Sequence, residues 1–408
     1  MDFPGVRRSL SGARETVYRR ALSRLRERKG SVVPRETIDQ TDGPTSAATP
    51  RPHDGGDNSF DLLRLLAATG VLVSHSYSLW NHIPDPLQKF LWGRYTLGDF
   101  CVYVFFIISG YLVTQSWVSD PHPSRYLVRR AVRILPALHV NLLLSVFVLG
   151  PVFTAATLSD YFSARETWDY LQGILVFPLK GGLPRMFETS VYPMLVNAPL
   201  WSLRIETLCY VLVPLLALFG LLGGRWRTTL VAVALAVLVE AQNMQWQPGL
   251  QVAVLWMEPT SMVGCTAYFF AGSALYFWRD RISWSGRAVA LFFVIMALAA
   301  TFAPSPPARM VPDPFLHALL PYCTLYFARL PTRRFLPAAK FGDLSYGIYI
   351  YAWPMQQIVA TLAAGRLSLP AYIGLSMAAT LVSALLSWHL VEKWALRLKP
   401  GRRQSLAH

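Results

Sequence analysis

The sequence predicts an all-α protein, a polytopic membrane bundle of about ten transmembrane helices. Three observations predict this fold class. Hydrophobic residues make up 53% of the 408 residues, only 15% are charged, and the mean hydropathy is +0.34. A soluble globule carries about 25% charged residues. Apolar segments long enough to cross a bilayer recur along the chain, and most basic residues fall between them, which is the pattern of a membrane protein with charged loops.

Residues 1–58 differ from the rest, because they hold eleven Lys or Arg and no long apolar run. Without an apolar core, this stretch is not a secretory signal peptide, and we expect it to stay in the cytoplasm. Apolar residues recur at helical spacing between Arg7 and Lys29, which fits either a helix lying on anionic lipid or a solvated basic tail. From Gly30 to Asn58 the composition predicts a largely disordered linker.

The ten apolar segments that follow form a predicted membrane domain over residues 59–395, ending in a second cytoplasmic tail at 396–408. With both termini in the cytoplasm, 29 Lys or Arg lie inside and 7 outside, as the positive-inside rule requires. An eleventh span at 165–180 would invert every later loop, so residues 154–200 are expected to form one long outer loop. The segments are 60–80, 95–119, 131–153, 201–222, 228–244, 260–278, 287–303, 313–329, 343–364 and 369–391.

The first segment, SFDLLRLLAATGVLVSHSYSLW, carries Arg64 and His75 inside an apolar run. They are eleven positions apart, which turns a helix to within about 20° of a whole number of turns, so both side chains share one stripe. An arginine near a helix centre costs about 2.5–3.5 kcal/mol on insertion scales, and such residues usually face a protein interior and mark a site. We predict that Arg64, near the inner boundary, and His75, deeper, look into one cavity.

The stretch SRYLVRRAVRILPALHV places an arginine cluster at the start of the third segment. Arg130 and Arg133 are three residues apart and are therefore neighbours on a helix surface. Guanidinium groups form bidentate hydrogen bonds with phosphate, so these two with Arg64 are candidate ligands of a phosphorylated cytoplasmic molecule. The alternative is that they are ordinary positive-inside arginines.

The fourth segment begins PLWSLRIETLCY, which puts Glu206 about 7 Å below the outer edge, near the depth of His75. A carboxylate beside a histidine fixes its tautomer and raises its basicity, so Glu206 and His75 are candidate members of a general base. The alternative is that Glu206 pairs with nearby Arg204.

Small and polar residues in two further segments are candidates for a substrate channel. In FFIISGYL, Ser109 and Gly110 interrupt a bulky run and allow close approach of a neighbouring helix or of a ligand. In DLSYGIYIYAWPMQQ, Tyr346 and Tyr349 add polar groups, and the proline at 354 should leave the Ile350 carbonyl without its helical partner. In the outer loop, aromatic residues beside carboxylates fit either sugar stacking or an interfacial aromatic belt.

Other chemistries lack the residues they need. The four cysteines stand singly in apolar segments without CxxC or histidine at ligand spacing, so no metal site is expected. The net charge is +15, but the basic residues lie between apolar segments rather than on one face of a folded domain. This distribution argues against nucleic-acid binding. No GxSxG elbow, GxGxxG loop or phosphate loop is present.

These segments together resemble the acyltransferase-3 family of integral membrane O-acyltransferases, over about residues 58 to 395. The matching motifs are the basic residue, ten others and histidine at Arg64 and His75, FFIISGYL, the pair Arg130 and Arg133, WSLRIETLCY and LSYGIYIYAWP. The chain departs from many members at Ala352, where they carry a histidine, so no proton-transfer role is assigned there.

The resemblance implies transfer of an acyl group, commonly acetyl, from cytoplasmic acyl-CoA to a hydroxyl of a surface glycan or lipid-linked saccharide, in a bacterial inner membrane. On this basis Arg64, Arg130 and Arg133 would bind the donor, and His75 would act as general base or, alternatively, carry the acyl group covalently. A transporter or flippase of a lipid-linked glycan is the alternative function, because intramembrane charges also serve transport.

Overall fold

The computed structural model describes residues 59–177, 182–245, 259–302, 312–330 and 343–400. The predicted N-terminal tail and most of the C-terminal tail lie outside these residues. The described residues form helices without β-strands, apart from two isolated β-bridges at Thr154–Met186 and Gly182–Leu195, so the all-α class is confirmed for them.

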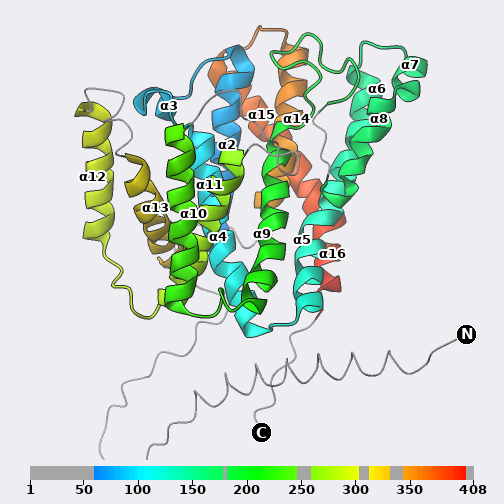
Figure 1. Cartoon of the computed structure of the whole chain (residues 1–408). Helices are drawn as coiled ribbons and strands as arrows, with labels where there is room; N and C mark the ends of the chain where they lie inside the picture. Colours follow the sequence, from blue (N-terminus) through cyan, green and yellow to red (C-terminus); the bar gives the residue numbers. More distant parts are fainter. Residues whose placement is uncertain (1–58, 178–181, 246–258, 303–311, 331–342, 401–408) are drawn as a thin grey trace, which may run out of the picture. The chain divides into compact units, whose positions relative to one another are not determined.

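A helix occupies each of the ten predicted segments (Figure 1). The long helices are α2 (Phe60–Asn81), α4 (Leu97–Ser119), α5 (Pro123–Leu144), α9 (Trp201–Leu218), α10 (Arg225–Gln245), α11 (Pro259–Trp278), α12 (Gly286–Phe302), α13 (Pro312–Arg329), α14 (Ser345–Ala363) and α15 (Leu369–Ser387). α5 continues through η1 (Ser145–Leu149) into α6 (Gly150–Phe153), and α15 continues through η6 (Trp388–Glu392), α16 (Lys393–Ala395) and η7 (Leu396–Leu398).

Five of these helical stretches are long and apolar enough to cross a membrane. They are Phe60–Asn81, Leu97–Ser119, Pro123–Phe153, Ala198–Leu218 and Leu369–Leu398. The other described helices do not meet both conditions: the apolar part of α12, for example, is the shorter stretch Gly286–Leu298, and α14 carries two adjacent glutamines. The count of ten spans therefore stays a prediction.

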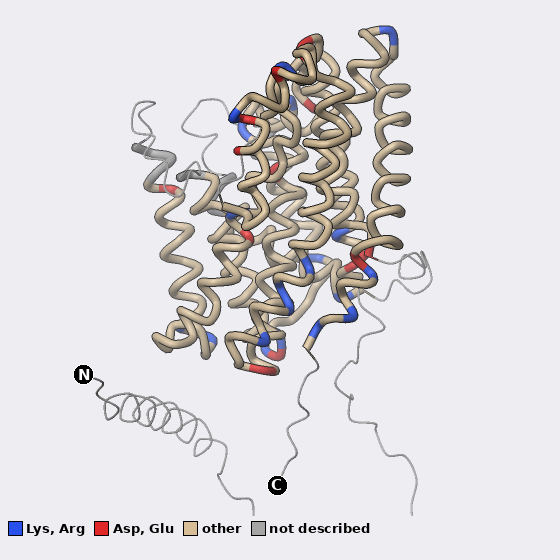
Figure 2. Tube along the Cα trace, turned by 90° about the vertical axis from the view of Figure 1, so that its right-hand side faces the viewer, with Lys and Arg blue, Asp and Glu red and all other residues tan. Residues whose placement is uncertain are grey.

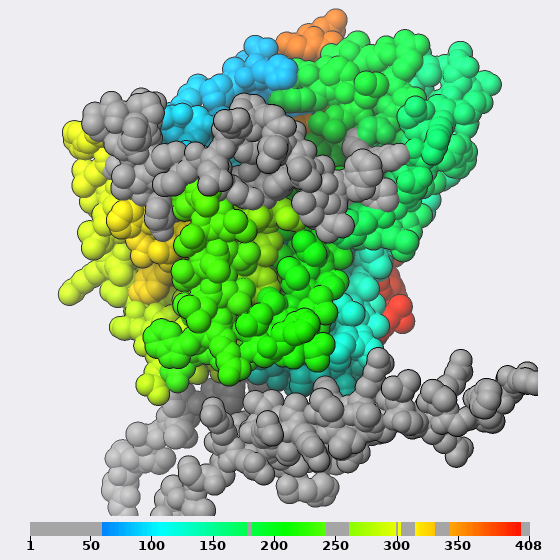
Figure 3. All heavy atoms as spheres, viewed as in Figure 1, coloured from blue at the N-terminus to red at the C-terminus, as the bar shows by residue number. Residues whose placement is uncertain are grey.

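The helices run between two ends of the bundle, called upper and lower here after their position in Figure 1. The upper end carries α3 (Pro86–Phe90), α7 (Leu158–Ser163) and α8 (Arg165–Tyr170), and the lower end carries the connections from α4 to α5 and from α9 to α10. Charged residues lie mainly toward the two ends (Figure 2). α9 and α10 form the middle of the face seen in Figure 3.

α4 and α11 cross with their backbones in contact at two glycines. A Cβ atom on Gly110 would lie 1.8 Å from the carbonyl oxygen of Phe269, and one on Gly272 would lie 2.1 Å from that of Ile107. Ser273 Oγ donates to the Gly110 carbonyl at 3.2 Å. The predicted use of Gly110 in close helix packing is confirmed, and the preceding residue, Ser109, donates to Glu206 of α9.

The proline in α14 leaves the Ile350 carbonyl without its helical donor, as predicted, and two asparagines replace that donor. Asn141 Nδ2 on α5 donates to this oxygen at 3.1 Å, and Asn197 Nδ2, just before η3 (Ala198–Leu200), donates at 2.8 Å. A buried carbonyl without a hydrogen-bond donor is energetically costly, so these two bonds stabilise α14. They also join α14 to α5 and to the upper loop.

The upper loop between α6 and η3 is folded on its own aromatic residues. Tyr161 and Tyr170 are fully buried, and the Tyr161 hydroxyl donates to the Val146 carbonyl at 3.0 Å. These two rings therefore form neither a sugar platform nor an interfacial belt, because the loop packs them against the end of α5. Gln357 of α14 fixes the later part of the loop by donating to the carbonyls of Tyr192 and Leu195 at 2.8 and 3.0 Å.

Candidate active site

A cavity of about 640 Å³ lies between α2, α4, α5, α9, α14 and the segment that follows η7. Seven of the eight predicted site residues line it, and His75 does not. The seven are Arg64, Ser109, Arg130, Arg133, Glu206, Tyr346 and Tyr349. The structure therefore gathers residues from helices far apart in the sequence around one space.

Carboxylates neutralise most of the arginines at the lower mouth of the cavity. Asp120, the residue after α4, accepts from Arg125 Nη2 at 2.5 Å and from Arg129 Nη1 at 2.8 Å, both near the start of α5. Hydrogen bonds from Arg125 and Arg129 hold the pKa of the Asp120 carboxyl well below its usual range. Asp343, before α14, accepts from Arg133 Nη2 at 2.5 Å. These pairs fix the geometry of the mouth.

Three other cations at the mouth have weaker or no ion-pair partners among the described residues. Arg64 Nη1 lies 3.5 Å from an oxygen of Asp61, whose side chain is 57% exposed, so this contact is screened by water. Arg130 stands 5.8 Å from the centre of the Tyr210 ring, and its Nε is buried without an acceptor. Lys399 forms no ion pair within the described part of the chain. The mouth thus presents positive charge to a ligand.

Polar groups gather higher in the cavity around Glu206. Its Oε1 accepts from Ser109 Oγ at 3.0 Å and from the Tyr210 hydroxyl at 2.5 Å. The hydroxyl of Tyr349 shares a 2.5 Å hydrogen bond with Ser202 Oγ. No hydrogen bond joins Glu206 and His75 among the described residues, so the expected pair does not form there.

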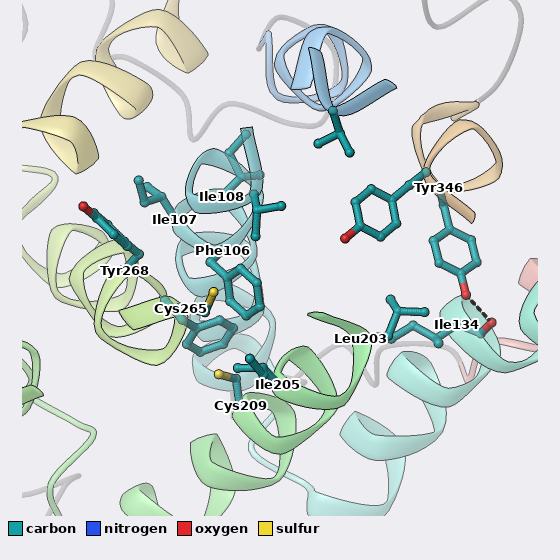
Figure 4. Close-up of a cluster of buried hydrophobic side chains, with 14 of the residues drawn as sticks. Phe106, Ile107, Ile108, Ile134, Leu203, Ile205, Cys209, Cys265, Tyr268 and Tyr346 are labelled. Atoms are coloured by element: carbon teal, nitrogen blue, oxygen red, sulfur yellow. Dashed lines mark hydrogen bonds between the residues drawn. The ribbon is translucent and has the colours of Figure 1, made fainter. Parts of the chain in front are cut away.

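Apolar side chains also line the cavity. Ile134, Leu203 and Tyr346 face one another from α5, α9 and α14, and the Tyr346 hydroxyl donates to the Ile134 carbonyl at 2.8 Å (Figure 4). With its hydroxyl bonded to the backbone, Tyr346 presents the ring to the cavity. An extended, partly apolar ligand arm fits such a wall.

His75 lies outside the lining, which corrects the prediction that it shares one cavity with Arg64. α14 covers this part of α2: the Trp353 ring packs edge-on against the His75 ring at 5.1 Å, and Gln356 Nε2 donates to Ser76 Oγ at 2.7 Å. Helical periodicity predicted that Arg64 and His75 share one face of α2. It could not predict that α14 packs against this face at His75. The Nδ1 atom of His75 is buried and has no hydrogen-bond partner among the described residues.

Glu206 and His75 lie at different depths in the bundle. Ser74, next to His75, packs near the upper end of α4, where a Cβ atom on Gly98 would lie 3.2 Å from Ser74 Oγ. Glu206 bonds to Ser109, eleven residues farther along α4, a rise of about 16 Å. The prediction that Glu206 lies near the depth of His75 is therefore wrong.

Sequence reasoning missed four residues of the site: Asp120, Tyr210, Asp343 and Lys399. Charged residues at the ends of apolar segments look like solvated loop charges, so nothing distinguished the two aspartates and the lysine. Tyr210 follows Glu206 by four residues, and that spacing, which places both on one helix face, was the available indication.

Comparison with known proteins identifies the family. The model of the acyltransferase-3 family, described as an acyltransferase domain, matches residues 57–388. The chain belongs to this family. An O-acetyl transferase of Shigella phage Sf6 is 30% identical over 345 residues, which cover 82% of this chain and 95% of that protein. Nodulation protein 10 of Rhizobium leguminosarum bv. viciae is 30% identical over 381 residues, which cover 86% of this chain and 98% of that protein. No solved structure matches.

The predicted resemblance is thus confirmed, and the member of the acyltransferase-3 family described here is an O-acyltransferase. Its apolar helices make it a multi-pass membrane protein. No group of three or more potential metal ligands occurs among the described residues. An acyltransferase of this kind needs a donor site and a group that accepts the proton of the receiving hydroxyl, and the cavity offers candidates for both.

Proposed function

We propose that this protein transfers an acyl group, acetyl in the simplest case, from acyl-CoA to a hydroxyl of a surface glycan or lipid-linked saccharide. The observation that carries the proposal is how charged groups are distributed along the cavity. Incompletely paired cations stand at its lower mouth, and a carboxyl group held by two hydroxyls stands farther up, five residues from the upper end of α9. A phosphate-rich donor with a long apolar arm matches that distribution of charge.

Arg64, Arg130 and Arg133 would hold the phosphates of the donor. The buried Nε of Arg130 supports this assignment, because a buried donor atom without an acceptor is costly and an anionic oxygen would satisfy it. Arg133, already bonded to Asp343, has further N–H groups available for a second acceptor. Acyl-CoA supplies an activated thioester, which an alcohol can attack without a protein nucleophile.

His75 and Glu206 would manage the proton of the acceptor. As the acceptor oxygen forms its bond to the thioester carbonyl carbon, its proton passes to the His75 imidazole, the carbon–sulfur bond breaks, and the thiolate leaves and takes up a proton. The unpartnered Nδ1 of His75 supports this role. Glu206, which lines the cavity and accepts hydrogen bonds from Ser109 and Tyr210, would act on the acceptor hydroxyl from inside the cavity. Ser109 and Tyr349 would line the path of the acyl arm.

The orientation follows from the basic lower end. Arg125, Arg225 and Arg279 belong to that end on the predicted topology, so the mouth would open to the cytoplasm, where acyl-CoA is made. The acceptor would then arrive from the upper end. The name of the related O-acetyl transferase supports acetyl as the acyl group, and a glycan acceptor suits the hydroxyl chemistry.

The test compares membranes containing the wild type with membranes containing His75→Ala, using His389→Ala as the control. His389 is exposed on η6 and lies outside the cavity lining. Acetyl transfer from radiolabelled acetyl-CoA to surface polysaccharide, followed by mass spectrometry of the glycan, should disappear in His75→Ala and persist in the control. Acylation that continues in His75→Ala while glycan export stops would instead support a transporter.

The same preparation separates direct transfer from a covalent intermediate. Wild-type protein is incubated with acetyl-CoA and no acceptor. The mass of the proteolytic peptide that contains His75 is then measured by mass spectrometry. An unmodified peptide supports direct attack, whereas an added acetyl group on His75 supports the covalent route.

A further inference from the structure

The mouth of the cavity carries more positive charge than its own carboxylates neutralise. Five cations line the cavity: Arg64, Arg129, Arg130, Arg133 and Lys399. Asp120 and Asp343 pair with Arg129 and Arg133. Arg64 has only a screened contact with an exposed aspartate, and neither Arg130 nor Lys399 has an ion pair among the described residues. Like charges held together near an apolar cavity repel one another, and an anion relieves that repulsion.

Lys399 reaches this mouth because the chain continues past α15 along the lower part of α5. η6, α16 and η7 each contact α5, and α16 lies beside it in Figure 1. Leu396, Lys399 and Pro400 all line the cavity. Arg397, one position after Leu396, is outside the lining and stacks on the Trp394 ring at 4.2 Å. The segment thus has one face toward the cavity and one away from it.

We propose that Lys399 binds a phosphate group of the donor together with Arg64 and Arg130, so that the segment after the last helix forms a wall of the donor site. This inference rests on the proposed function and extends the donor site beyond the arginines that the sequence predicted. A lysine suits this place, because its ammonium group is a point charge on a long flexible stem that can follow a phosphate at the edge of a cavity.

The ionisation of Lys399 gives the proposal a measurable property. Partial burial of the ammonium group, with repulsion from Arg133, Arg130 and Arg64 and partial compensation by Asp343, lowers its pKa to about 8. These groups belong to α2, to α5 and to the residues just before α14. In the free protein Lys399 is charged below this pKa and neutral above it. An anion stabilises the charged form, so donor binding should weaken as the pH rises above about 8.

The experiment measures acetyl-CoA binding and transfer for the full-length protein in detergent or proteoliposomes. The variants are Lys399→Met and Lys399→Arg, and Arg397→Met is the control, since it removes one positive charge from the same segment outside the cavity. Lys399→Met should raise the KM for acetyl-CoA about tenfold, with little change in kcat, and the control should leave both unchanged. Lys399→Arg should bind acetyl-CoA nearly as well as the wild type but lose the decline above pH 8, because guanidinium stays charged.

Inorganic pyrophosphate separates this inference from the proposed donor. If the wild type binds acetyl-CoA and Lys399→Met binds it equally well at pH 7, the role of Lys399 is refuted while the proposed function stands. If the wild type does not bind acetyl-CoA, but pyrophosphate raises its melting temperature and does so less for Lys399→Met than for Arg397→Met, the anion site is supported and the identity of the donor is wrong. An equal response to pyrophosphate in both variants refutes the anion site as well.

Discussion

Replacing Gly110 by alanine tests whether the contact between α4 and α11 positions the candidate site. In an open helix the change would stabilise the protein by about 1 kcal/mol, because alanine is the better helix former. Here the new Cβ atom would lie 1.8 Å from the Phe269 carbonyl oxygen, and real Cβ atoms do not approach other atoms within 3.0 Å. The two backbones must therefore separate by at least the difference, about 1.2 Å.

The cost follows from what this separation breaks. Overpacking a tight contact costs about 1–3 kcal/mol. The hydrogen bonds from Ser273 Oγ to the Gly110 carbonyl, at 3.2 Å, and from Thr114 Oγ1 to Ser273 Oγ, at 2.9 Å, contribute about 1 kcal/mol each. After the gain in helix propensity is subtracted, Gly110→Ala should lower the free energy of unfolding by about 2–4 kcal/mol.

The assay is thermal unfolding in detergent micelles, with Gly264→Ala as the control. Gly264 lies in α11, the other helix of this contact, but a Cβ atom there meets nothing within 4 Å. The melting temperature should fall by several degrees for Gly110→Ala and stay equal or rise for the control. Transfer activity should fall below the level explained by unfolding, because the neighbouring Ser109 donates to Glu206. Equal melting temperatures for the two variants would refute the packing argument.

Four further predictions, from three substitutions, concern charge, pH, the upper loop and the carboxyl group of Glu206. Asp120→Asn leaves two arginines without their carboxylate and should cost about 3 kcal/mol, measured as a lower melting temperature. Because the folded-state pKa of Asp120 is depressed, its ion pairs stabilise the wild type above about pH 4 and are lost as the pH falls further, so Asp120→Asn should show a weaker acid dependence of melting. Asn197→Ala removes one of the two donors to the Ile350 carbonyl and should cost about 1–3 kcal/mol, with faster proteolysis in residues 182–197. Glu206→Gln keeps an oxygen that can accept from Ser109 but removes the charge, so kcat should fall about 10²- to 10⁴-fold at an unchanged melting temperature, and full activity in this variant would exclude a role for the carboxylate.

The sequence was informative where a polar residue interrupts an apolar run. Arg64 and Glu206 stood out because charge inside a membrane segment is costly, and both line the cavity. The proline in α14 predicted a free carbonyl at Ile350 from covalent structure alone. The roles of these residues in catalysis stay predictions.

The parts that could not be predicted depend on which helices become neighbours. Periodicity put Arg64 and His75 on one stripe, but the packing of Trp353 against His75 depends on where α14 lies. Asp120 and Asp343 could not be matched with their arginines, because Asp343 is 210 residues from its partner. Lys399 stood in a stretch expected to be a tail, since a lysine just beyond a membrane segment is the common topological pattern.

Pro354 has no backbone N–H, so the Ile350 carbonyl accepts hydrogen bonds from Asn141 and Asn197 instead. These bonds stabilise the bundle. Exchanging Pro354 for alanine would restore a regular α14 and give the Ile350 oxygen a partner within its own helix. The amides of Asn141 and Asn197 would then compete with that new N–H for the same acceptor. Alanine at position 354 would thus favour a regular α14 but weaken its hydrogen bonds to α5 and to the upper loop. At this position, the most stable isolated helix is not the one that packs best in the bundle.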